Sequence, residues 1–172
     1  MRCAPERDQQ FTDFVRLRRA SLVQTARLLF SGDEHRAEDA VQTALIKLYV
    51  IWPRVRSDTR DAYARRCVVN AVMDEHRSLF RRREHVAAQP PDQAASPVDA
   101  DASPVLMLLR ELPTRMRIAV VLRYVDGLSV AETAEAMECS TGNVKSQCAR
   151  GLDQLRVALS DPAHHAACAA SS

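Results

Sequence analysis

Apolar residues recur every three or four positions through most of residues 1–85, a spacing that predicts amphipathic helices rather than strands. The first repeat covers residues 11–29, and Ser31-Gly32-Asp33 then supplies a stop and a candidate N-cap. The second covers residues 37–52 and is closed by Pro53. A third helix is expected at about residues 61–83. The N-terminal part of the chain is therefore predicted to be a small helical unit.

The third expected helix has two different faces. At about 100° per residue, its apolar side chains gather on one side. The opposite side, about 80° wide, carries Tyr63, Arg66, Asn70, Met73, Arg77 and Arg81. A ring can stack on an unpaired base, an amide can pair with a base edge, and guanidinium groups can hold phosphates, so this side suits a single-stranded nucleic acid. For this helix alone, a solvated charged face whose tyrosine merely packs is an equally good interpretation.

The segment 86–104 differs sharply in composition from its surroundings. It contains four prolines and three aspartates but no basic residue. Such a sequence is unsuited to forming a core, so we expect a flexible tether there. The tether would join the unit in residues 1–85 to a second one in residues 105–160, with a disordered tail at 161–172.

The second unit begins with two expected helices, at residues 105–111 and 115–125, separated by Leu112-Pro113. Asp126-Gly127 ends the second of them, because glycine readily takes the left-handed cap conformation. Ser129 followed by Glu132 forms a capping box and marks the start of another helix, which should end near Met137.

A last helix is expected from about Thr141, with Ser140 as its cap and Glu138-Cys139-Ser140 as the turn before it. Its predicted buried positions are Val144, Cys148, Leu152, Leu155 and Leu159. Its predicted outer stripe contains Asn143, Ser146, Gln147, Arg150 and Gln154. Amide, hydroxyl and arginine side chains read base edges in a major groove, so the pattern predicts a DNA-binding helix-turn-helix. Two packed helices with a polar outside are the less favoured interpretation, because turn, cap and stripe agree.

Composition supports an all-α chain of two small helical domains. The chain has 172 residues, 47% of them hydrophobic, and only 4 glycines. The formal net charge of +2 excludes a uniformly basic surface, so any DNA binding must come from local clusters of charge. Residues 1–10 lack the apolar segment of a secretory signal, and no apolar run approaches the ~20 residues of a membrane span. The 5 cysteines lack CxxC spacing, which favours reduced thiols in the cytoplasm.

Three segments resemble the extracytoplasmic-function sigma factors of the sigma-70 family. Residues 112–155, from LPTRMRIAVV to ARGLDQL, look like their region 4. Residues 37–49, AEDAVQTALIKLY, resemble region 2.2, and residues 62–84 resemble regions 2.3 and 2.4. The run NVKSQ at 143–147 is similar to an actinobacterial subset. No segment is long enough for the middle region of larger sigma factors, as is typical of this group.

The resemblance implies a role for each helix. Glu38, Asp39 and Gln42 would bind the clamp helices of core RNA polymerase, while the second unit would meet the polymerase flap. Capture of the −10 promoter element is implied for Tyr63, Arg66, Asn70, Arg77 and Arg81. Recognition of the −35 element is implied for Ser140, Thr141, Asn143, Lys145, Ser146, Gln147 and Arg150. The resemblance further implies an anti-sigma partner, no cofactor, no metal, no membrane insertion and no catalysis.

Two residues depart from the family pattern. Thr43 stands where glutamate is common, which puts the clamp contact in question. Glu138 stands where glycine is usual in the turn, and a left-handed conformation there would cost on the order of 1–2 kcal/mol.

Other functions compete with this interpretation. A conventional helix-turn-helix regulator would bind duplex DNA without polymerase, but it leaves the polar face of the third helix unexplained. An enzyme or metal protein would need more than His164, His165 and Cys168, which lack four well-spaced ligands, or the pair Cys139 and Cys148. A helical adaptor without a nucleic-acid role is the third alternative.

Overall fold

The computed structural model describes residues 4–85 and 103–160, and within these ranges every regular element is helical. The elements in chain order are α1 (Ala4–Leu29), α2 (Glu34–Ile51), α3 (Arg60–His85), α4 (Pro104–Glu111), α5 (Thr114–Val120), the π-helical turn η1 (Val121–Val125), α6 (Val130–Ala136) and α7 (Thr141–Ser160). The predicted all-α class is confirmed. The expected tether, apart from its last two residues, and the expected tail lie outside the described residues.

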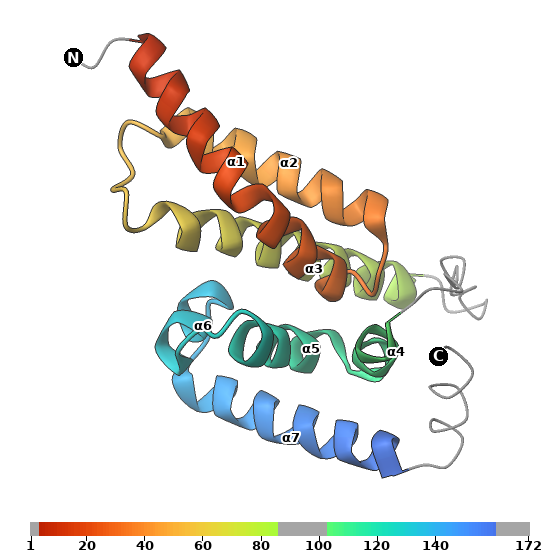
Figure 1. Cartoon of the computed structure of the whole chain (residues 1–172). Helices are drawn as coiled ribbons and strands as arrows, with labels where there is room; N and C mark the ends of the chain where they lie inside the picture. The colour runs from red at the N-terminus through yellow and green to blue at the C-terminus, as the bar shows by residue number, and fades with distance from the viewer. Residues whose placement is uncertain (1–3, 86–102, 161–172) are drawn as a thin grey trace.

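Helices α1, α2 and α3 form an N-terminal unit around one apolar core (Figure 1). The predicted stripe of α2 is confirmed, because Val41, Ala44 and Leu48 have no exposed surface. Trp52 follows α2 and is only 2% exposed, with the ring of Phe11 at 5.2 Å, edge to face. The guanidinium of Arg60 lies 3.6 Å from the centre of the Trp52 ring and covers it. Aromatic contacts thus fix the end of α2 and the start of α3.

The remaining helices form a C-terminal unit whose centre is Ile118, Leu122 and Val144. Gly151 lets α7 approach α5 closely, because a Cβ there would lie 2.9 Å from Val120 Cγ2. The expectation for the buried face of α7 was partly wrong. Leu152 and Leu155 are half-buried, and Leu159 is 51% exposed. The last turns of α7 run past α5 toward the short helix α4, which covers them only in part (Figure 1).

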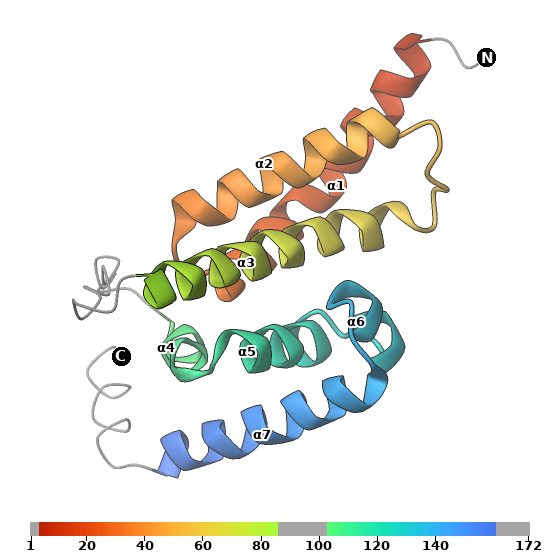
Figure 2. The ribbon, with the colours of Figure 1, turned by 180° about the vertical axis from the view of Figure 1, so that it is seen from behind.

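The two units pack against each other along α3, which faces α5 and α6, while α1 meets η1 (Figure 2). Arg110 Nε donates to the Ser31 carbonyl at 2.7 Å. The Thr25 hydroxyl donates to Asp126 at 2.7 Å, and Arg65 Nε lies 3.3 Å from the same carboxylate. Burial raises the pKa of Asp126, while the bond from Thr25 and the charge of Arg65 lower it. The pattern of apolar residues did not predict how the two units pack against each other.

The turn between α1 and α2 is held tightly inside this junction. Ser31 and Gly32 both have positive φ angles, 59° and 86°, so the chain reverses through two left-handed residues. A Cβ at Gly32 would lie 2.7 Å from both Arg110 Nη2 and Leu106 Cδ2. Asp33 then caps α2, as predicted, by accepting from Arg36 N at 3.0 Å.

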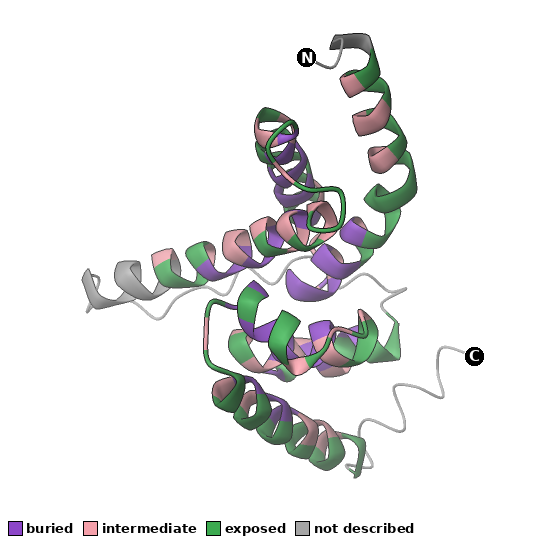
Figure 3. Cartoon of the chain, turned by 90° about the vertical axis from the view of Figure 1, so that its left-hand side faces the viewer, coloured by how far each residue is buried: buried purple, intermediate pink, exposed green. Residues whose placement is uncertain are grey.

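Buried residues line the inner faces of both units, while the outer sides of α2 and α7 are largely exposed (Figure 3). Among the described helices, none combines the length and apolar character needed to cross a membrane.

Candidate nucleic-acid interface

The turn between α6 and α7 has the geometry expected of a helix-turn-helix. Ser129 Oγ accepts from Glu132 N at 3.1 Å, and Glu132 Oε2 accepts from Ser129 N at 2.8 Å, so the predicted capping box is present. Ser140 Oγ accepts from Asn143 N at 3.2 Å and begins α7. Glu138 has a φ of 50°, which makes it the left-handed residue of the turn. These contacts fix the direction in which α7 leaves α6.

The side of α7 that would enter a groove is open to solvent. Five of its predicted contact residues are exposed: Ser140, Thr141, Lys145, Ser146 and Arg150. The other two, Asn143 and Gln147, are half-buried. We call these seven residues the groove face. They carry hydroxyl, amide and positively charged groups within the first turns of a helix, as major-groove recognition requires.

The left-handed turn allows a test of its backbone strain. Glu138→Gly should be more stable to unfolding than Glu138→Gln by about 1 kcal/mol, because glycine alone takes this φ without a Cβ clash. Both variants lose the charge, and Glu138→Ala, which also loses the contact with Asn70, should likewise be less stable than Glu138→Gly if the backbone is the cause. Urea denaturation of the full chain measures these stabilities, and equal midpoints would show that the turn is unstrained.

Helix α3 brings Tyr63, Arg66, Asn70 and Arg77 onto one side, as predicted, and we call these four residues the strand face. Tyr63 and Asn70 are half-buried, whereas Arg66 and Arg77 are exposed. Arg77 forms an ion pair with Asp74 one turn away. Burial raises the pKa of the Tyr63 hydroxyl, and the neighbouring Cys67 raises it further by a smaller amount. The ring therefore remains a neutral stacking surface.

Met73 and Arg81 were expected on the same side of α3 as the strand face. Met73 is only 7% exposed, so its assignment to an open polar face was wrong. It lies one turn beyond Asn70, on the side of α3 that packs on the C-terminal unit. The side chain of Arg81 lies outside the described residues.

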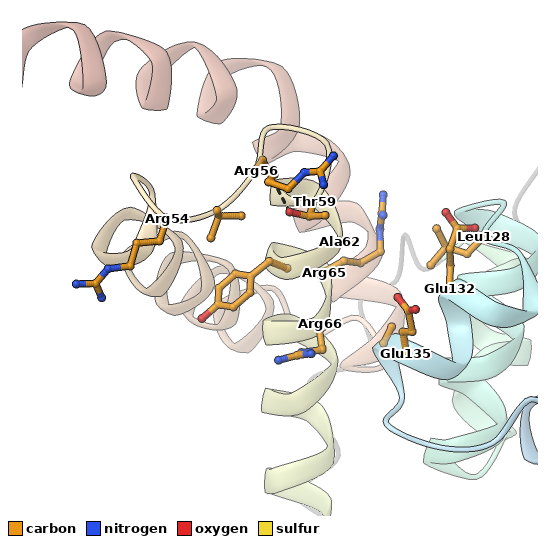
Figure 4. Close-up of a pocket in the computed structure, with 12 residues that line it drawn as sticks. Arg54, Arg56, Thr59, Ala62, Arg65, Arg66, Leu128, Glu132 and Glu135 are labelled. Atoms are coloured by element: carbon orange, nitrogen blue, oxygen red, sulfur yellow. Dashed lines mark hydrogen bonds between the residues drawn. The ribbon is translucent and has the colours of Figure 1, made fainter. Parts of the chain in front are cut away.

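A pocket of about 440 Å³ lies beside the strand face, between α3 and α6. Figure 4 shows arginines from α3 and the loop before it on one side of the pocket, and glutamates from α6 on the other. The charged lining residues are Arg54, Arg56, Arg65, Arg66, Glu132 and Glu135. Arg54 and Arg56 were not among the predicted site residues, although two arginines within three residues of Pro53 are a visible signal.

The outer side of α2 presents a different surface. Asp39 and Gln42 are exposed, whereas Glu38 is half-buried and pairs with Arg19 at 2.5 Å. Ile46 and Val50 continue this side and are 65% and 71% exposed. Neither was predicted as a site residue, although they follow Gln42 at intervals of four. Polar groups and then apolar groups thus follow one another along one open helix face, which suits a protein partner.

The described residues contain no group of three His, Cys, Asp or Glu side chains placed to hold a metal ion. Cys148 is 6% exposed and packs in the core as expected, while Cys67 and Cys139 are half-buried free thiols. His164, His165 and Cys168 lie outside the described residues.

Comparison with known proteins gives consistent matches across both units. The family models for Sigma-70 region 2 and for Sigma-70, region 4, match residues 14–83 and 103–155. The chain is 36% identical over 156 residues to the RNA polymerase sigma-E factor of Streptomyces avermitilis, covering 87% of this chain and 85% of that protein. It is 33% identical over 153 residues to the ECF RNA polymerase sigma factor SigM of Mycobacterium tuberculosis, covering 84% and 74%.

Solved structures show the same fold. The sigma factor RpoE of Bartonella quintana, crystallised with the anti-sigma factor NepR, superposes with a TM-score of 0.70. The match has 23% identity and covers 90% of this chain and 99% of that one. CnrH, in complex with the cytosolic domain of CnrY, gives a TM-score of 0.63 at 21% identity, with 88% of each chain covered.

Proposed function

This chain belongs to the extracytoplasmic-function sigma factors of the sigma-70 family, and we propose that it divides the work of a sigma factor among three surfaces. As a member of that family it binds core RNA polymerase and directs promoter-specific initiation of transcription. Sigma factors in general are not enzymes, and we propose no catalysis for this chain. Its contribution would be binding energy.

The proposed domains follow the two units. Residues 1–85 would act as sigma region 2 and residues 105–160 as sigma region 4. Residues 86–104 would be the linker between them and residues 161–172 a tail.

The strand face of α3, together with Arg81, would capture the −10 element as a single strand. Tyr63 offers a ring for stacking, Asn70 an amide for a base edge, and Arg66 and Arg77 positive charge for phosphates. Arg54 and Arg56 add to the positive charge around the adjacent pocket. Flipping a base out of the duplex costs a few kcal/mol, and stacking on one aromatic ring returns about 1–3 kcal/mol.

The groove face of α7 would read the −35 element as duplex DNA. The capped start of α7 points its backbone N–H groups toward the same end as Thr141 and Asn143, and helix N-termini attract phosphate. Lys145 and Arg150 would contact phosphates or base edges, and the hydroxyl and amide side chains would read bases.

The outer side of α2 would bind the clamp helices of the polymerase through Glu38, Asp39 and Gln42, with Ile46 as an apolar contact. The C-terminal unit would meet the flap. An anti-sigma factor is also proposed as a partner, since both structural neighbours were solved with proteins bound, one of them named as an anti-sigma factor.

A single observation supports the proposal most strongly. Each of two units buries its apolar side and carries an arginine-bearing polar face, one on α3 and one at the start of α7. With a net charge of only +2, the free protein should bind DNA weakly. Two modest contacts become strong only when the polymerase holds both units on one promoter.

The test is reconstitution with core RNA polymerase and sequencing of transcript start sites on genomic DNA. The double variant Arg77→Glu/Arg150→Glu should lose initiation at the wild-type start sites by at least about 30-fold, because each reversed contact costs roughly 1–3 kcal/mol.

Arg16→Glu/Arg156→Glu is the matched control. It reverses two exposed arginines, one on α1 and one near the C-terminal end of α7, and it should keep the start sites. Unchanged initiation by the Arg77/Arg150 variant would overturn the proposal. Tight duplex binding without core enzyme would instead identify a conventional regulator.

A further inference from the structure

One edge of α6 is acidic, and it faces the basic side of α3. Glu132 and Glu135 lie one turn apart on α6. Glu138 follows in the left-handed turn after the end of α6. We call these three residues the acidic edge. Glu132 and Glu135 line the pocket opposite Arg65 and Arg66 (Figure 4).

The last member of the acidic edge touches the strand face directly. Glu138 Oε1 lies 3.4 Å from Asn70 Nδ2, which donates to it, and 3.9 Å from Arg66 Nε. A carboxylate oxygen therefore occupies the space beside the amide and guanidinium that a nucleic acid would need. A strand of DNA that contacts these two groups must displace the Glu138 carboxylate.

We propose that the acidic edge is an internal mimic of DNA phosphates, which engages Asn70 and Arg66 of the strand face in the free protein and is displaced when the −10 strand binds. This inference rests on the proposed role of α3 in capturing that strand. Its carboxylates are negatively charged like phosphates and belong to the other unit, and the Glu138 carboxylate approaches the same donors, so separation of the two units would release it.

Glu132, one member of the acidic edge, is held in its charged form. Hydrogen bonds from the Ser129 side chain and backbone lower the pKa of Glu132, so it stays ionised near neutral pH. Glu138 keeps a left-handed backbone that glycine would adopt without strain. Strain retained at one residue is typical of positions where the side chain has a task.

The contacts are also weak enough to be reversible. Glu138 is 61% exposed in its side chain and Arg66 49%, and ion pairs at such exposure are readily broken and screened by salt. The acidic edge should therefore oppose loose binding by free DNA yet yield once the polymerase holds the units apart.

The experiment uses the full chain and a fluorescein-labelled single strand of twelve deoxythymidines, followed by fluorescence anisotropy at low salt. Glu135→Gln/Glu138→Gln should bind this probe about 5- to 10-fold more tightly than the wild type, because two negative charges leave the strand face. The gain should shrink at high salt and disappear when Arg66→Ala is added.

The matched control is Glu6→Gln/Asp13→Asn, which removes two exposed acidic charges from α1 and should leave the affinity for the probe unchanged. Equal gains in the two variants would overturn the inference, since net charge alone would then explain them. No gain in the α6 variant would overturn it as well, while the role of α3 would stand if Arg66→Ala still weakens initiation with polymerase. If Arg66→Ala changes neither probe binding nor initiation, both the inference and the role of α3 fail.

Discussion

Alanine in place of Tyr63 should slow the formation of open promoter complexes by about 10- to 100-fold, whereas phenylalanine should leave the rate near that of the wild type. A stacked base gains about 1–3 kcal/mol from an aromatic ring, and phenylalanine keeps the ring while losing the hydroxyl. The measurement is permanganate reactivity of unpaired thymines over time, with core polymerase and a promoter identified by start-site sequencing.

A template already melted across the −10 element should reduce the Tyr63→Ala defect, because the DNA no longer has to be opened. Tyr63 also packs partly against the core, so the stability of each variant should be measured by thermal unfolding. A phenylalanine variant as slow as the alanine variant would contradict stacking and assign the role to the hydroxyl.

Leu48→Ala should lower the free energy of unfolding by about 2–5 kcal/mol, since Leu48 has no exposed surface and its removal leaves a cavity. Ile46→Ala, two residues earlier in α2, should change it by less than about 0.5 kcal/mol because Ile46 is 65% exposed. Urea denaturation of the full chain measures both.

The Leu48→Ala and Ile46→Ala variants also distinguish an effect on stability from an effect on polymerase binding. Ile46→Ala should weaken the affinity for core polymerase several-fold, since interface apolar groups are buried on association. The Leu48→Ala protein that remains folded should bind normally. An Ile46→Ala variant with unchanged affinity would remove the outer side of α2 from the polymerase interface.

Helix positions were largely predictable because each is encoded locally. The stripe of α2 appears in the spacing of its apolar residues, and the cap of α6 appears in the pair Ser129 and Glu132. Both signals act over a few residues. Leu159 was misassigned because periodicity marks a face but not whether another helix reaches it.

The junction between the units was not predictable from such signals. Arg110 binds a backbone carbonyl 79 positions away in the chain, and Thr25 donates to Asp126 across 101 positions. Neither contact has a periodic signature, since each depends on how two finished units meet. Met73 was placed on an open face for the same reason.

The candidate site was predictable where its chemistry lies on one helix. The groove face of α7 follows directly from its polar stripe, and most of it is exposed. The pocket was missed because Arg54 and Arg56 come from the α2–α3 loop, whose course no repeat describes. Ile46 was missed because an exposed isoleucine resembles a core residue in sequence.

The left-handed turn at Ser31 and Gly32 makes substitutions in the turn depend on residues at the start of the second unit. The carbonyl oxygen of Ser31 accepts a hydrogen bond from Arg110, and Arg110 and Leu106 fill the space beside Gly32. A lineage that lengthens this turn, or replaces the glycine, must therefore also alter the start of the second unit. Positions 32, 106 and 110 are expected to covary among descendants that keep this junction, even though two whole helices, α2 and α3, separate position 32 from the other two in the sequence.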